Sequence, residues 1–82
     1  MNDRATVRAF LKGLLLERGD TSEFADTDSL IILRGRLASV DVLELVVFLE
    51  EQYKVDFAGQ GFDLNRLDTV DEIMALIEEA AA

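Results

Sequence analysis

The chain has 82 residues, with 17 acidic and 8 basic side chains, a formal net charge of −9, and neither Cys nor His. A chain of this length forms one small domain, residues 1–82, whose core must suffice without disulfides. An acidic surface disfavours nucleic acid and anionic lipid as ligands, and favours a protein partner that carries a basic patch.

The acidic charge is concentrated after Arg36. Residues 1–36 hold six acids and six bases, whereas residues 37–82 hold eleven acids and only Lys54 and Arg66 as bases. Solubility alone is the simpler explanation of such a surface. Since no signal-peptide pattern opens the chain and no apolar run approaches the roughly 20 residues that span a bilayer, we expect a monomeric cytoplasmic protein without membrane insertion.

A first helix is predicted to begin at Asn2 or Asp3, either of which can cap it, and to stop at Gly19. Apolar residues at the i, i+3, i+4, i+7 and i+8 positions predict its buried face, formed by Val7, Phe10, Leu11, Leu14 and Leu15. Its outer side repeats a base at every fourth position, at Arg4, Arg8 and Lys12. We interpret these three bases as a solvated face.

Residues 20–38 are predicted to form a long connection that is ordered, because a loop of this length is uncommon in a compact domain unless it has a function. Many of its side chains are apolar, so we expect it to pack over the helices, with one helical turn near residues 29–33.

A second helix is predicted from Ser39, as its N-cap, to Tyr53, a stretch without Gly or Pro. Fifteen residues exceed the usual length of a strand, and the carboxylates do not alternate with period two, so a helix is favoured despite the β-branched residues. One apolar stripe is predicted to face the core, formed by Val42, Leu45, Val46, Leu49 and Tyr53.

A second face of this helix is mixed in character. Val40, Glu44, Val47 and Glu51 follow one another at spacings of four, three and four, and Asp41 lies beside them in the first turn. We predict that these five residues face outward and bind a partner. A solvated face with two isolated valines explains the same pattern about equally well.

The last part of the chain is predicted to contain a short third helix within residues 62–67, with Leu64 and Leu67 directed inward. A capping-box pattern at residues 69–72 then begins a last helix that carries Ile73, Leu76 and Ile77. The predicted fold class is therefore all-α, with three main helices and one short helix.

Intrinsic catalysis is not expected. Without His and Cys, the usual nucleophile–base pairs and the commonest metal ligand are absent, and no phosphate loop, zinc spacing or EF-hand pattern occurs. The pairs Glu50-Glu51 and Glu78-Glu79 do not supply a convergent carboxylate pair, because adjacent residues of a helix point in different directions. We predict neither an enzyme nor a metal site.

The stretch from Gly35 to Ser39, followed by residues 40–46, resembles the acyl carrier protein family, including its D-alanyl and aminoacyl carrier relatives. In that family an Asp-Ser-Leu motif opens the second helix of a four-helix bundle, and its Ser carries 4′-phosphopantetheine as a phosphodiester. By position, that residue is Ser39. The segments 50–53, 55–57 and 69–73 also look similar to the family, so the resemblance covers nearly the whole chain.

The sequence departs from the family pattern within the three-residue motif. Ala38 stands where the family has Asp, and Val40 where Leu is common, so only the Ser of the motif is present. An upstream copy, Asp28-Ser29-Leu30, spells the motif but is not followed by an acidic and apolar helix. We interpret Ser29 as a loop residue.

The resemblance implies a carrier that tethers an acyl or aminoacyl group as a thioester on a 4′-phosphopantetheine arm derived from coenzyme A. The implied partners are a phosphopantetheinyl transferase, a loading ligase, and a downstream acyltransferase or synthase with a basic docking patch. A phosphodiester at Ser39 would also suit the positive end of a helix. Two alternatives stay open: an unmodified, carrier-like acidic interaction module, and a small helical adaptor unrelated to carriers.

Overall fold

The computed structural model describes residues 3–60 and 63–81, and within these ranges it is helical and contains no strand. Three main helices, α1 (Asp3–Glu17), α2 (Ser39–Tyr53) and α4 (Val70–Ala81), are joined by a long loop and by two short helices, α3 (Phe57–Gln60) and the 3-10 helix η1 (Leu64–Leu67). The all-α prediction is confirmed. The single short helix predicted within residues 62–67 corresponds to η1, while Phe62 lies outside the described residues.

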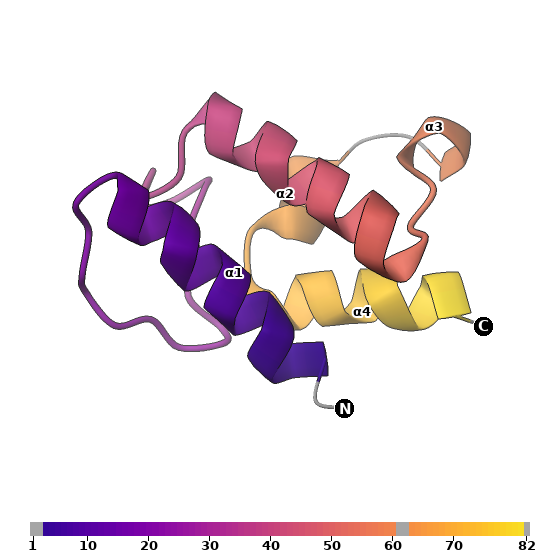
Figure 1. The fold of residues 1–82 in the computed structure, drawn as a ribbon, viewed down its shortest axis with the longest axis horizontal. Helices are drawn as coiled ribbons and strands as arrows, with labels where there is room; N and C mark the ends of the chain where they lie inside the picture. Colours follow the sequence, from indigo (N-terminus) through magenta and orange to yellow (C-terminus); the bar gives the residue numbers. More distant parts are fainter. Residues whose placement is uncertain (1–2, 61–62, 82) are drawn as a thin grey trace.

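The core forms where the three main helices meet. Figure 1 shows α1 and α2 side by side, and α4 contacts both of them. Each helix contributes the apolar stripe that its sequence periodicity predicts. Fully buried side chains at the centre are Val7, Leu11, Leu45, Leu49, Val70 and Ile73. The predicted inner residues Phe10, Val46 and Tyr53 are only half-buried at the edge of this core.

The ends of the helices follow from local chemistry. Gly19, with φ +79°, ends α1 in the left-handed conformation that glycine adopts most easily. Lys54 takes the same conformation after α2, and its backbone N–H donates to the carbonyl of Leu49. At the start of α4, Thr69 Oγ1 accepts a hydrogen bond from Glu72 N at 3.0 Å, as the capping pattern predicts.

The loop of residues 20–38 packs against the helices, as predicted, through the buried side chains of Phe24, Leu30 and Leu37. The helical turn predicted near residues 29–33 is wrong. The N–H groups of Ile31 and Ile32 donate to the Asp68 carboxylate, and that of Leu33 donates to Ser29 Oγ. The Ser29 side chain thus takes the Leu33 N–H, which a helical turn would have paired with the Ser29 carbonyl.

The basic side of α1 fastens this loop, instead of forming the purely solvated face that we predicted. Arg4 bridges Asp26 and Asp71, with both N–O distances at 2.6 Å. Arg8 also pairs with Asp26, and it donates to the carbonyl of Phe24 while lying 4.5 Å from the centre of that ring. These contacts tie the loop to both α1 and α4.

None of the helices in the described residues has the length and apolar character needed to cross a bilayer.

Candidate functional site

Ser39 is the first residue of α2, and it is exposed. The helix is capped one residue earlier than predicted, because Ala38 is the N-cap, with φ −93° and ψ 174°, and its carbonyl accepts the first helical hydrogen bond from Val42 N. The prediction that Ser39 is the N-cap is therefore wrong. An alanine offers no side-chain acceptor, so the N–H groups at the start of α2 gain no bond from the cap residue.

Asp41 fixes the start of α2 through a different bond. Its Oδ2 accepts a hydrogen bond from Ala38 N at 2.9 Å and pairs with Arg18 Nη1 at 3.2 Å. Asp41 is only 4% exposed, so the prediction that it faces outward with the partner-binding residues is wrong. This carboxylate instead fixes the start of α2 and ties it to the residue that follows α1.

An apolar pocket of about 350 Å³ adjoins Ser39. Its lining comes from the loop, from the first turns of α2 and from η1: Ile31, Leu37, Ala38, Ser39, Val42, Leu43 and Leu64. Leu64 was predicted to point into the core, but it is 40% exposed and lines this pocket. Ser39 is therefore both exposed and part of a hollow that suits an apolar or extended chain.

The loop wall of the pocket is held by Asp68, a residue that the sequence did not single out. Its Oδ1 accepts hydrogen bonds from the N–H groups of Ile31 and Ile32, both at 2.8 Å. Burial alone would raise the pKa of Asp68, but hydrogen bonds from Ser29 and from these N–H groups outweigh it and hold the pKa below its usual value. Asp68 is therefore a buried anion that positions the loop.

Ser29 belongs to the same arrangement. It is buried, and its Oγ accepts a hydrogen bond from Leu33 N at 2.9 Å. The interpretation of Ser29 as a loop residue is confirmed. Ser29 also borders a polar hollow of about 280 Å³ beside Ser22 and Arg34, but only 9% of the residue is exposed.

Arg36 shapes the chain just before Ser39. Its guanidinium donates to both oxygens of Asp20 and to the carbonyl of Ser22. The hydrogen bond from Arg36, followed by that from Ser22, lowers the pKa of Asp20 to about 2. Arg36 is thus engaged in holding the loop.

The outer face of α2 carries the remaining predicted residues. Val40 is 61% exposed and Val47 is 50% exposed, and Glu44 and Glu51 are also exposed. The structure adds Leu43, which is 64% exposed. Sequence reasoning missed Leu43 because it falls between the two stripes that were traced along the helix.

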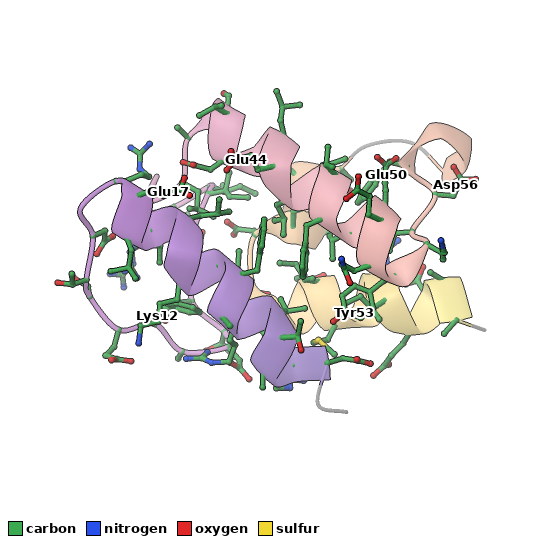
Figure 2. All side chains as sticks on the ribbon, in the orientation of Figure 1. Lys12, Glu17, Glu44, Glu50, Tyr53 and Asp56 are labelled. Carbon is green, nitrogen blue, oxygen red and sulfur yellow. The ribbon has the colours of Figure 1, made fainter. Side chains whose placement is uncertain are left out.

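These outer residues of α2 form one wall of a groove of about 690 Å³ whose other wall is α1. Figure 2 shows Glu17 of α1 and Glu44 of α2 near one end of these two helices, and Lys12 on the side of α1 away from α2. The stacked rings of Phe10 and Phe48, with centroids 4.1 Å apart, also line the groove. No sequence signal pointed to α1 as part of this surface.

Within the described residues, no group of three or more carboxylates comes together to hold a metal ion. The chemically distinctive feature is instead the exposed primary hydroxyl of Ser39, next to the pocket and to the outer face of α2. No protein-family model, curated protein or solved structure matches the chain.

Proposed function

We propose that this chain is a carrier protein that holds an acyl or aminoacyl group as a thioester on a 4′-phosphopantetheine arm attached to Ser39. In this proposal α1, α2 and α4, with α3 and η1 together in the place of the third helix, form a four-helix bundle of the acyl-carrier type. The observation that carries the proposal is the exposed Ser39 in the first turn of α2, where it also lines an apolar pocket.

The residues around Ser39 suit a phosphodiester. The first N–H groups of α2 have no intrahelical acceptor, and the aligned peptide dipoles make this end of the helix positive. A phosphate on Ser39 would lie beside these donors. The pocket lined by Leu37, Leu43 and Leu64 would accommodate part of the arm or of its cargo.

The attachment step forms a bond between Ser39 Oγ and phosphorus. The hydroxyl proton passes to a base of the transferase, the pyrophosphate P–O bond of coenzyme A breaks, and adenosine 3′,5′-bisphosphate leaves. Once bound, the group supplies the thiol that a thioester needs and that this chain, without Cys, does not have. The protein contributes a rigid attachment point, because Asp41 and Asp68 fix the helix start and the loop beside Ser39.

The outer face of α2 is the proposed contact surface for partner enzymes. Val40 and Val47 offer apolar contacts, while Glu44 and Glu51 offer charge that complements a basic patch on the transferase, on the loading ligase or on a downstream acyltransferase or synthase. Asp41 is left out of this surface because it is buried.

The proposal is tested by incubating the chain with coenzyme A and a broad-specificity phosphopantetheinyl transferase, followed by intact mass and peptide mapping. We expect the addition of one phosphopantetheine group, located on Ser39. Ser39→Ala should abolish the addition, and the matched control Ser22→Ala, at another exposed serine, should leave it unchanged.

No addition under conditions that fully modify a known carrier, or addition at another serine, would contradict the carrier assignment. The first of these results would favour the alternative of an unmodified acidic interaction module. The replacement of the family's Asp by Ala38, the N-cap of α2, is the observation that keeps this alternative open.

A further inference from the structure

The groove between α1 and α2 is a second concave surface, distinct from the Ser39 pocket. It is open and mainly apolar, and residues of both helices line it: Ala9, Phe10, Gly13, Leu14 and Glu17 from α1, and Val40, Leu43, Glu44, Val47, Phe48 and Glu51 from α2. Leu43 lines both the groove and the pocket, so the two hollows share a wall.

Gly13 is the most informative residue of the groove. It lies in the interior of α1, where glycine costs about 0.5–1 kcal/mol relative to alanine. No heavy atom lies within 4 Å of the position that its Cβ would take, so no close contact inside the chain requires a glycine. Ala9, one turn earlier, is also small. Because these two side chains are small, the backbone of another helix can approach the α1 side of the groove closely.

The charge around the groove is of one sign. Glu17, Glu44 and Glu51 line it, and no Lys or Arg is among the described lining residues. The neighbouring bases are directed elsewhere, since Arg18 pairs with the buried Asp41 and Lys12 lies on the other side of α1. A second copy of this chain, with its own net charge of −9, would be repelled, whereas a cationic segment would be attracted.

We propose that the α1–α2 groove binds an amphipathic helix of a partner protein, with an apolar stripe flanked by Lys or Arg. Val40, Leu43 and Val47 form a ridge at helical spacing along one wall, and a helix laid against such a ridge can interdigitate with it. Small residues on α1 allow the close approach, and the three glutamates pair with the flanking bases. In this binding mode a helix lies in a groove, and a few of its apolar side chains make the main contacts.

This proposal adds a helical partner segment to the contact surface already proposed on α2. It rests on the proposed function in one respect, namely that the partner is an enzyme that acts on the carried group. The shared Leu43 would then place the docked helix directly beside the arm on Ser39. The groove itself does not depend on modification, so it can be tested with the unmodified chain.

The test uses a designed helical peptide with a leucine stripe flanked by lysines, and a scrambled peptide of the same composition. Binding is measured by fluorescence anisotropy and located by amide chemical shifts. We expect the amphipathic peptide to bind at least about tenfold more tightly than the scrambled one, with shifts at residues 13, 43 and 47. Gly13→Leu places a large side chain in the groove, and leucine is also a good helix former, so α1 should be retained. This variant should weaken binding at least about tenfold.

The matched control is Gln52→Leu, which adds the same side chain to an exposed position of α2 outside the groove lining and leaves the charge of the chain unchanged. It should leave binding unaltered, and urea titrations should show both variants folded. Equal binding of both peptides, or unchanged binding to Gly13→Leu, would overturn the proposal. Self-association of the unmutated chain that Gly13→Leu abolishes would also overturn it, because the occupant would then be a second copy.

Failure here and failure of the carrier proposal are distinguishable. Peptide binding does not require phosphopantetheine, so Ser39→Ala should abolish modification and leave peptide binding intact. Peptide binding that is absent while Ser39 is still modified would overturn the groove proposal alone, and peptide binding that is present without modification of Ser39 would contradict the carrier proposal alone.

Discussion

Ser29 and Ser39 lie in similar local sequences, each followed by an apolar residue, but the fold treats them in opposite ways. Ser29 is buried in the loop, where it accepts a hydrogen bond from Leu33 N and bonds with Asp68. Ser39 is exposed at the start of α2. The serine in the complete Asp-Ser-Leu motif is therefore the less accessible one.

This contrast shows that accessibility is decided by remote residues. Asp28, which precedes Ser29, accepts a local hydrogen bond from Ala25 N at 2.8 Å. The residue that holds residues 29–33 in place is Asp68, 37 positions further along the chain from Ile31. A short motif specifies the side chains available to an enzyme, whereas tertiary contacts specify whether the enzyme can reach them.

The sharpest test of the contrast is the reactivity of a single thiol. The chain has no Cys, so Ser39→Cys and Ser29→Cys each introduce one reporter. The Ser39→Cys thiol should react freely with iodoacetamide. The Ser29→Cys thiol should react on the order of 100-fold more slowly, because the loop must first open.

Rates in urea provide the control for this comparison, since both thiols should react alike once the chain is unfolded. Similar rates in the native chain would contradict the difference in burial. A urea titration of Ser29→Cys must show a folded chain before its rate is interpreted.

A smaller effect is expected from removal of Asp68. Asp68→Ala leaves the N–H groups of Ile31 and Ile32 without their acceptor. Both hydrogen bonds are part-buried, so water can replace the carboxylate, and each lost bond should cost about 0.5–1.5 kcal/mol of unfolding free energy. Urea titration measures the loss, and amide exchange of these two residues should accelerate. Glu78→Ala, at an exposed carboxylate of α4, is the matched control and should change little.

The same variant has a characteristic pH dependence. The pKa of Asp68 is lowered in the folded chain, so its contribution to stability is present above the unfolded value of about 4 and is lost as the pH falls through the folded value. The stability difference between the unmutated chain and Asp68→Ala should therefore narrow in acid. A difference that grows as the pH falls would contradict a lowered pKa.

Much of the fold could be predicted because it depends on local signals. The stripes around Leu11, Leu45 and Ile73 have helical periodicity, and Gly19 and Thr69 mark helix ends through conformation and capping. The loop conformation could not be predicted, because it depends on hydrogen bonds to Asp68 and on ion pairs with Arg4 and Arg8. Nothing in the sequence distinguishes these partners from other charged residues.

The candidate site was predictable to a similar degree. Helical spacing placed Val40, Glu44 and Val47 on one exposed face. Helical spacing gave the wrong orientation for Asp41. A carboxylate in the first turn of a helix can either face solvent or accept a hydrogen bond from the N–H of the residue before the helix, and only the positions of Arg18 and Ala38 decide between the two. The α1 wall of the groove depends on how two helices pack, which neither helix encodes alone.

The smallest expected effect comes from Ala38→Asp, which gives Ser39 the preceding Asp that Ser29 already has. The extended backbone of Ala38 suits an N-cap, where replacing Asp by Ala typically costs about 0.5–2 kcal/mol, so the reverse change should stabilise the chain. The Asp41 carboxylate, 2.9 Å from Ala38 N, adds repulsion that puts the gain at the lower end. Ala38→Asn, a neutral cap, separates the two effects and should stabilise at least as much. If urea titration shows both variants to be less stable than the unmutated chain, the start of α2 does not lack a cap. A faster attachment of phosphopantetheine to the Asp variant would then reflect contact with the transferase instead of a more stable helix start.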